Sequence, residues 1–281
     1  MDRPLSAVLF ALLLVLAGCN GFTLGGSETS TQRVTPANVP TDEPTPTPIP
    51  QLAPGVTGKG VTEPERLGEA HESILENISY TVDQNVSVRY LNGTIYRQRT
   101  SHIQHAMNDG RFYLAHNRSL VSGRGSSGFS AWSNGKRTLV AQSSNNTTKY
   151  QIPPQGSLSF GSPGERIAAL FGSVETHVVA QEQRDGITVY RVKATGLVRD
   201  PPTFANEWQN PRDVTLRALI DSRGFVYEYQ LSYEATVNGV PIYVYEQVRY
   251  TDLRNTTVER PPWYEEAIEN VSTTTASTTV T

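Results

Sequence analysis

Apolar residues are spaced differently along the chain, and each spacing predicts a different kind of structure. Residues 5–16 form a continuous apolar run apart from Ser6, whereas residues 20–54 and 270–281 are polar. Between these polar stretches, apolar residues recur first at helical spacing and then, from Tyr80, at every second position. The pattern divides the chain into a leader (1–18), a tether (19–54), one folded domain (55–269) and a tail (270–281).

Two helices are predicted in the folded domain. The first begins at a capping box, with Thr62 as N-cap and Glu65 as the third helical residue. Its apolar stripe is Leu67, Ala70, Ile74 and Leu75. The second begins at a capping box formed by Ser162 and Glu165, and Gly172 is expected to end it. Its apolar residues are Ile167, Leu170 and Phe171. A last helical turn is expected at 263–268.

Strands account for most of the remaining domain. Asn-Gly and Asp-Gly pairs, which supply the positive φ of tight hairpin turns, recur between the apolar runs. They stand at 92–93, 109–110, 134–135, 185–186 and 238–239. Because strands follow one another through short turns, the pattern predicts an α+β fold that is mainly antiparallel β, without alternation of strands and helices.

The most regular strand pattern is that of residues 225–233. One face of this strand carries Phe225, Tyr227, Tyr229, Leu231 and Tyr233. Three tyrosines are many for a closed core, because each buried hydroxyl needs a hydrogen-bond partner. The stripe indicates an apolar surface that is partly open. A plain sheet core with the hydroxyls at its rim gives the same pattern.

The leader ends in Leu16-Ala17-Gly18-Cys19, which holds the only cysteine of the chain. A charged residue, a short apolar core and small residues before a cleavage site are the features of a secretory signal, and the core is too short to span a bilayer. The sequence L-A-G-C resembles the lipobox of bacterial and archaeal lipoproteins. The resemblance implies that Cys19 is lipidated, becomes the first mature residue and holds the protein on the outer face of the cytoplasmic membrane. The alternatives are an ordinary signal peptide with an incidental cysteine, or an uncleaved anchor.

Composition narrows the possible functions. The formal net charge of −3 argues against a nucleic-acid partner, which requires a basic surface. The Pro- and Thr-rich tether favours an extended chain, and the Thr-rich tail is predicted to be disordered. Once Cys19 carries a lipid, no thiol remains for a disulfide, a metal site or a nucleophile.

No catalytic constellation is recognisable. Residues 123–128 match G-x-G-x-x-G, but a strand is expected after them, whereas a phosphate cradle needs a helix N-terminus. His102 and His105 lie in a strand-like stretch, so they should face opposite sides of the sheet. We therefore expect a protein that is not an enzyme, with no cofactor and no metal site.

Asparagines in N-x-[ST] motifs are frequent. Among them, Asn92 begins a predicted hairpin turn and Asn255 follows the last predicted strand. Both should be accessible, so they are the leading candidates for glycosylation. A turn-rich, Thr-rich composition alone would also produce several such motifs.

Two hairpin motifs carry a resemblance to a known architecture. They are W-x-N-G-K-x-x-L, from Trp132 to Leu139, and I-D-x-x-G-x-V, from Ile220 to Val226. With a leading helix and a Pro-led helix between strands, this order resembles periplasmic lipoprotein carriers and related lipid-binding lipoproteins. The resemblance implies a curved half-barrel sheet with the N-terminal helix and the short central helix on its concave face. The chain also resembles uncharacterised surface lipoproteins of haloarchaea, which imply no activity.

Two hypotheses of function follow. In the first, the half-barrel binds an apolar small molecule, a lipid or an acyl chain. Its cavity would be lined by the stripe Phe225, Tyr227, Tyr229, Leu231 and Tyr233, with Leu67, Ile74 and Ile167 from the helices. In the second, the domain is a non-catalytic structural or interaction module that docks to another envelope protein. An unfilled interior favours the first hypothesis, and a filled interior favours the second.

Overall fold

The computed structural model describes residues 50–107, 109–120, 125–145, 147–154, 156–158, 161–198 and 207–277. All of them belong to one of the two compact units into which the chain divides, Pro48–Thr281. Cys19, the leader and most of the predicted tether lie outside the described residues. The first described strand, β1, begins at Gln51, so regular structure starts before the predicted end of the tether.

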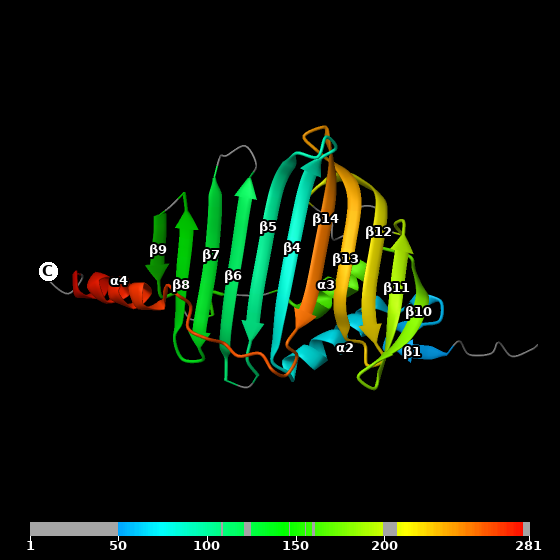
Figure 1. Ribbon diagram of the computed structural model, residues 1–281, viewed down its shortest axis with the longest axis horizontal. Helices are drawn as coiled ribbons and strands as arrows, with labels where there is room; N and C mark the ends of the chain where they lie inside the picture. The colour runs from blue at the N-terminus through cyan, green and yellow to red at the C-terminus, as the bar shows by residue number, and fades with distance from the viewer. Residues whose placement is uncertain are drawn as a thin grey trace, which may run out of the picture. The chain divides into compact units, whose positions relative to one another are not determined.

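A curved, open antiparallel sheet of 11 strands dominates this unit (Figure 1). One arm of the sheet is β4 (Tyr80–Tyr90), β5 (Ile95–His105), β6 (Arg111–Leu120), β7 (Ser126–Asn134), β8 (Thr138–Ser144) and β9 (Thr147–Gln151). The other arm is β10 (Thr176–Arg184), β11 (Ile187–Thr195), β12 (Gln209–Asp221), β13 (Val226–Val237) and β14 (Val240–Thr251). Each arm is a meander of hairpins, as the turn signals predict. The arms join where β14 pairs with β4.

Two helices lie on the concave face, behind the sheet in Figure 1. They are α2 (Pro64–Glu76) and α3 (Pro163–Phe171). The chain leaves one edge of the sheet at β9, forms α3 and returns at the opposite edge with β10. The fold class expected from the sequence is confirmed: α+β, mainly antiparallel, with a half-barrel sheet.

Only one of the two predicted capping boxes forms. At α3, the Ser162 hydroxyl accepts a hydrogen bond from the Glu165 backbone N–H at 3.0 Å. At α2, the N-cap is Glu63 and no side chain caps the helix. The prediction of Thr62 as N-cap is wrong, because the backbone N–H groups of Thr62 and Glu63 both donate to the carbonyl of Gly55. A preceding turn therefore replaces the expected side-chain cap.

The two helices touch through glycines. A Cβ on Gly68 of α2 would lie 2.4 Å from the carbonyl oxygen of Gly164, and a Cβ on Gly164 would lie 2.6 Å from that of Gly68. The backbones are therefore closer than any larger residue allows. Beneath this contact, Leu67, Ile167 and Phe171 are buried against the sheet in the main core.

A small three-stranded sheet precedes α2. Its strands are β1 (Gln51–Ala53), β2 (Val56–Thr57) and β3 (Gly60–Val61). The Val61 N–H donates to the Thr176 hydroxyl at 2.7 Å, so the small sheet sits against β10 at one edge of the large one. A Cβ on Gly60, whose φ is +123°, would lie 2.1 Å from the Thr176 carbonyl oxygen.

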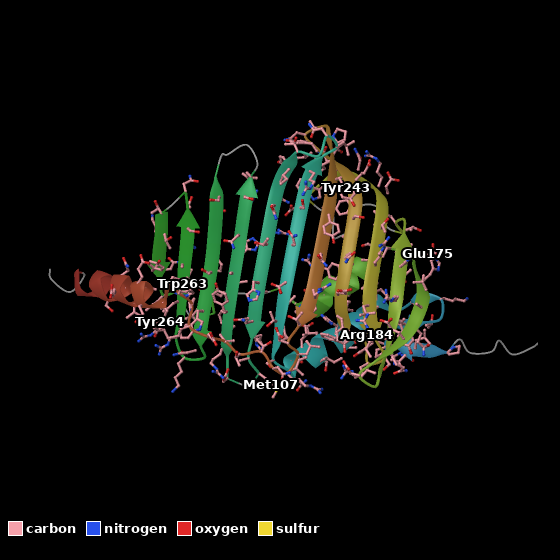
Figure 2. The ribbon with its side chains drawn as sticks, viewed as in Figure 1. Met107, Glu175, Arg184, Tyr243, Trp263 and Tyr264 are labelled. Atoms are coloured by element: carbon pink, nitrogen blue, oxygen red, sulfur yellow. The ribbon has the colours of Figure 1, made fainter. Side chains whose placement is uncertain are left out.

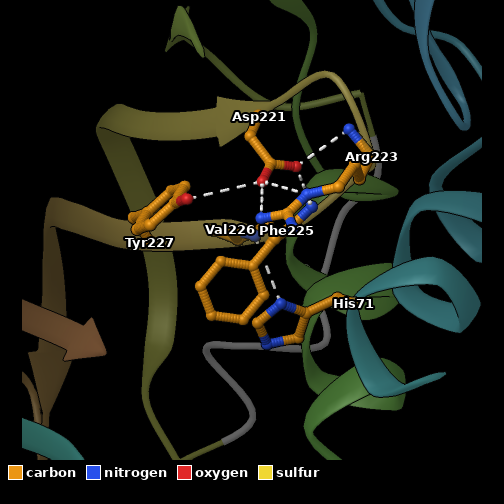
Figure 3. A network of polar contacts seen from close by, with 6 residues as sticks. All are labelled: His71, Asp221, Arg223, Phe225, Val226 and Tyr227. Atoms are coloured by element: carbon orange, nitrogen blue, oxygen red, sulfur yellow. Dashed lines mark hydrogen bonds and ion pairs between the residues drawn. The ribbon is translucent and has the colours of Figure 1, made fainter. Parts of the chain in front are cut away.

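The I-D-x-x-G-x-V motif forms the β12–β13 hairpin (Figure 3). Asp221 is fully buried, and its carboxylate accepts hydrogen bonds from the backbone N–H groups of Arg223 and Phe225, both at 2.9 Å, and from the Arg223 guanidinium. His71 of α2 packs below this turn, where its Nδ1 accepts from the Val226 N–H at 3.2 Å and its ring stacks on Phe225. The motif therefore shapes the turn against which α2 packs.

A third described helix, α4 (Tyr264–Ser277), packs through Ala267 against Trp132 and Leu139, at the β9 end of the sheet. The segment that leads to it crosses in front of the strands in Figure 1. Trp132 of β7 meets the Tyr264 ring edge-on at 5.0 Å, and Tyr150 of β9 donates a hydrogen bond to Glu266 at 2.9 Å. Figure 2 shows Trp263 and Tyr264 at the start of this helix. The sequence predicted one turn followed by a tail from 270, whereas the helix continues through 277.

Candidate functional site

A buried polar cluster lies in the middle of the concave face. Glu246 of β14 is 8% exposed, and one of its carboxylate oxygens, Oε1, accepts three side-chain donors. The Tyr229 hydroxyl donates at 2.7 Å, Gln84 Nε2 donates at 3.1 Å, and Arg166 of α3 forms an ion pair with the same oxygen. Arg166 Nε also donates to the Tyr229 hydroxyl at 2.7 Å. The cluster ties α3 to three central strands.

Charge and burial stabilise one protonation state of this cluster. Burial and the neighbouring Glu246 carboxylate hold the pKa of Tyr229 well above its usual value, so the phenol keeps its proton. Burial acts to lower the pKa of Arg166, but Tyr229 and Glu246 outweigh it and raise that pKa. The hydroxyl and the carboxylate are therefore already occupied by each other and by Arg166.

Two neighbouring cavities on the concave face share Arg166 as a lining residue. The first, here called the Trp208 cavity, measures about 400 Å³. Its walls include Arg97, Arg99, Trp208, Leu231, Tyr233 and Val244. The second, here called the Ile103 cavity, measures about 610 Å³. Its apolar walls come from β4, β5, β6 and β14 and include Val82, Ile103, Phe112, Leu114, Val248 and Tyr250.

Polar groups stand at one side of the Ile103 cavity. Glu72 of α2 and Ser162 at the start of α3 line it, and the serine hydroxyl donates to the glutamate carboxylate. On the sheet side, burial raises the pKa of Tyr250, which keeps this phenol neutral. An apolar surface with a few polar groups at its margin can hold an apolar molecule.

The predicted aromatic stripe is split by the structure. Tyr229, Leu231 and Tyr233 line the Trp208 cavity. Phe225 and Tyr227 do not: Phe225 precedes β13 and is fully buried in a second cluster, with Leu75 and Ile78. The pairing of β12 with β13 shifts by one residue at Tyr227, and such a bulge interrupts the alternation of faces on which the stripe was predicted.

None of the three predicted helix residues lines either cavity. Leu67 and Ile167 are 0% and 1% exposed in the main core, and Ile74 packs against the cluster around Phe225. These side chains fill the space between helices and sheet. The Ile103 cavity lies beside the helices, over β4–β6. The sequence analysis named no residue of these three strands as a lining residue.

The remaining candidates lie on the surface or outside the described residues. Asn92 and Asn255 are exposed. The Asn92 amide oxygen accepts the Thr94 N–H at 2.9 Å. His102 and His105 face opposite sides of the sheet as predicted: His102 contacts Asp83 at 2.7 Å, and His105 lines the Ile103 cavity.

Several residues of the site were missed by sequence reasoning. Arg97, Arg99, Ser101 and Ile103 alternate along one face of β5, and this period of two was readable in the sequence. Arg166 and Glu246 are 80 positions apart, and no local pattern joins them. In the part of the chain that the structure describes, no helix is both long enough and apolar enough to cross a membrane.

Fold and site together define a class: a β-rich half-barrel with helices on its concave face and a groove that side chains do not fill. The chain belongs to a protein family of unknown function, DUF7537, and the sequence model of this family matches residues 4–267. A comparison with curated proteins finds no match.

Solved structures with some likeness to this chain include three bacterial proteins. A DUF1329 family protein from Desulfovibrio piger is 10% identical with a TM-score of 0.27, and the match covers 73% of this chain and 96% of that one. The Mycobacterium tuberculosis lipoprotein LppX is 10% identical with a TM-score of 0.27, covering 69% and 97%. The MucA/MucB complex of Pseudomonas aeruginosa is 14% identical with a TM-score of 0.31, covering 70% and 58%. At such TM-scores these likenesses do not bear on function.

Proposed function

We propose that this protein is a non-catalytic, lipid-anchored extracytoplasmic lipoprotein that binds an apolar ligand, a lipid or acyl chain, in the groove of its half-barrel. The observation that carries the proposal is the Ile103 cavity of about 610 Å³ with apolar walls from four strands. Sites for small molecules typically measure about 300–1,000 Å³ and combine apolar walls with a few polar groups.

Burial of an acyl chain supplies enough free energy for such a role. Each methylene removed from water contributes about 0.8 kcal/mol. Burying about eight methylenes would therefore contribute roughly 6 kcal/mol, before the cost of ordering the chain and the loss of translational freedom. A longer chain could extend past Arg166 into the Trp208 cavity, since this residue lines both.

Location and modification belong to the same proposal. The L-A-G-C sequence supports lipidation at Cys19, which would place the domain on the outer face of the cytoplasmic membrane. The exposure of Asn92 and Asn255 is compatible with glycans at these positions. A two-chain lipid would be needed for stable anchoring, because a single acyl chain binds membranes only marginally.

Neighbouring residues of β6 provide a matched test. Leu114 lines the Ile103 cavity, whereas Ala115, the next residue, faces the convex side. Leu114→Glu should abolish binding of a fluorescent fatty acid, because a carboxylate among the apolar walls of the cavity must be desolvated when the acyl chain enters. Ala115→Glu should bind as the unmodified protein does, within about twofold.

Two outcomes would reject the proposal. They are equal effects of the two substitutions, and no binding by the unmodified protein. Either result would favour the second hypothesis, an envelope-interaction module that uses an exposed edge of the sheet such as β9, whose residues are mostly exposed.

A further inference from the structure

One face of β5 changes from basic to apolar along its length. Arg97 and Arg99 line the Trp208 cavity, and Ser101 and Ile103, further along the same face, line the Ile103 cavity. A strand rises about 3.3 Å per residue, so Arg99 and Ile103 are separated by about 13 Å. An elongated molecule lying along β5 would meet guanidinium groups at one end and apolar side chains at the other.

Arg99 is placed against a like charge. It pairs in register with Arg118 of β6, so two guanidinium groups stand on directly opposite positions of neighbouring strands. Like charges in this arrangement destabilise a sheet. Among the described residues neither arginine forms an ion pair or a side-chain hydrogen bond, and Arg99 Nε is buried without a partner. Within the described part of the chain, no direct ion pair or side-chain hydrogen bond offsets this repulsion, and the carboxylate that feels both charges is that of Glu207.

Arg97 differs from this pair. It forms an ion pair with Glu207, and its guanidinium lies 4.6 Å from the centre of the Trp208 ring. Although burial raises the pKa of Glu207, the hydrogen bond from Arg97 and the charges of Arg97, Arg99 and Arg118 hold it below its usual value. Only Arg97 contacts this carboxylate, whereas Arg99 and Arg118 act on it through their charge alone.

His116 lies beside the two arginines but adds no charge to this region. Burial and then the charges of Arg99 and Arg118 lower the pKa of this histidine, so it stays neutral beside them. The Tyr229 hydroxyl, which could otherwise receive a polar headgroup, is already bonded to Glu246. The guanidinium groups of Arg99 and Arg118 have donors that no other described side chain accepts.

We propose that the ligand of the groove is an anionic amphiphile, whose headgroup oxygens bind Arg99 and Arg118 while its chain occupies the Ile103 cavity. This inference rests on the proposed function and names its ligand class. A carboxylate or phosphate headgroup presents oxygens that match the planar donors of guanidinium groups, and such charge-assisted hydrogen bonds are among the strongest in proteins. A headgroup between the arginines would also relieve their mutual repulsion.

The test compares a fatty acid that carries a fluorescent tail with its uncharged methyl ester, at pH 8 and low ionic strength. The purified protein should bind the acid about tenfold more tightly than the ester. In the double variant Arg99→Gln and Arg118→Gln, the affinity for the acid should fall to that for the ester, which should itself be unchanged. The control is Arg89→Gln with Arg217→Gln, which removes the same charge at two exposed positions outside both cavities and should preserve the preference.

Each result decides between the two claims. If the unmodified protein binds acid and ester equally, or if the control loses the preference as the double variant does, the anionic ligand is rejected while the proposed function stands. If neither amphiphile binds, both claims fail. In that case a rise in melting temperature with inorganic phosphate would assign the arginines to a free anion.

Melting without ligand checks the fold independently. Because repulsion is removed, Arg118→Gln and the double variant should melt at or above the temperature of the unmodified protein. Melting of the exposed single variant Arg118→Gln below that temperature would mean that the arginines stabilise the sheet by themselves, and it would overturn the inference.

Discussion

His71 is fully buried although it lies on a helix whose outer side faces water. Its Nδ1 accepts the Val226 N–H, and its ring contacts both Phe225 and Tyr250 at 5.0 Å. Burial lowers the pKa of this histidine to about 3, so the ring is neutral in the folded protein. The imidazole therefore acts as an aromatic wedge with one hydrogen-bond acceptor.

The buried histidine makes stability depend on pH. An unfolded chain binds a proton at His71 below about pH 6.5, whereas the folded chain does not until the pH approaches 3. Its contribution is fully present above pH 6.5 and is lost as the pH falls, by up to about 1.4 kcal/mol per pH unit. Denaturant unfolding from pH 7 to 4 measures this slope. His71→Asn, whose amide oxygen can replace Nδ1, should remove this part of the slope.

The control is His177→Asn on β10, where the side chain is exposed. Its unfolding curves should follow those of the unmodified protein at each pH. If His71→Asn instead lowers the free energy of unfolding by the same amount at every pH, the histidine does not carry the dependence.

At the residue scale, the sequence predicted only the part of the site that obeys simple alternation. Tyr229, Leu231 and Tyr233 alternate from a regular pairing, so they reach the cavity together. Tyr227 sits at a bulge, and bulges leave no reliable local signal. The role of Glu246 could not be predicted for another reason, because its three partners come from distant parts of the chain.

At the scale of elements, the contact between α2 and α3 depends on two glycines. Gly68→Ala would gain up to about 1 kcal/mol of helix propensity. It would also place a Cβ 2.4 Å from the Gly164 carbonyl oxygen, which forces the helices apart. We expect net destabilisation of about 1–3 kcal/mol, measured by chemical denaturation.

A second glycine provides the comparison. A Cβ on Gly58 would have no heavy atom within 4 Å, so Gly58→Ala should change the free energy of unfolding by less than about 0.5 kcal/mol. A Gly68→Ala protein as stable as the original would show that the helices can separate without cost.

The helix termini were predicted only in part, because a local sequence motif does not always decide how a helix is capped. Ser162 caps α3 because its hydroxyl reaches the Glu165 N–H within one turn. Thr62 and Glu65 present the same letters at α2, but Gly55, seven residues before Thr62, accepts the backbone donors instead. The continuation of α4 beyond 270 was unexpected because Thr-rich segments have low helix propensity.

At the scale of the whole molecule, attachment to the membrane is predicted to depend on Cys19. Cys19→Ser should leave the precursor uncleaved or release the domain into the medium, because a serine cannot carry a thioether lipid. Membrane fractionation and intact mass measure this, and the same mass reports glycans on Asn92 and Asn255. Asn20→Ser, at the next position, should stay anchored. A Cys19→Ser protein that is cleaved, membrane-bound and unchanged in mass apart from the substitution would contradict the prediction.

The course of the chain through the sheet was predicted in part. Repeated turn signals indicate hairpins, and each arm of the sheet is a run of hairpins. The sequence does not indicate that β14 pairs with β4, because this contact joins the ends of the two arms and has no connecting turn. The position of both cavities depends on that pairing.

The same pairing has a kinetic consequence. Gln84 and Glu246 meet across it although they are 162 positions apart, so the centre of the sheet has a very high contact order. Such topologies fold slowly, since a long loop must close before its contacts are made. Until β14 is available, β4 and β13 each present an open edge to other chains. The middle of the groove is thus the last part that a growing chain can complete, and a truncated or stalled chain would be prone to aggregate before it could bind a ligand.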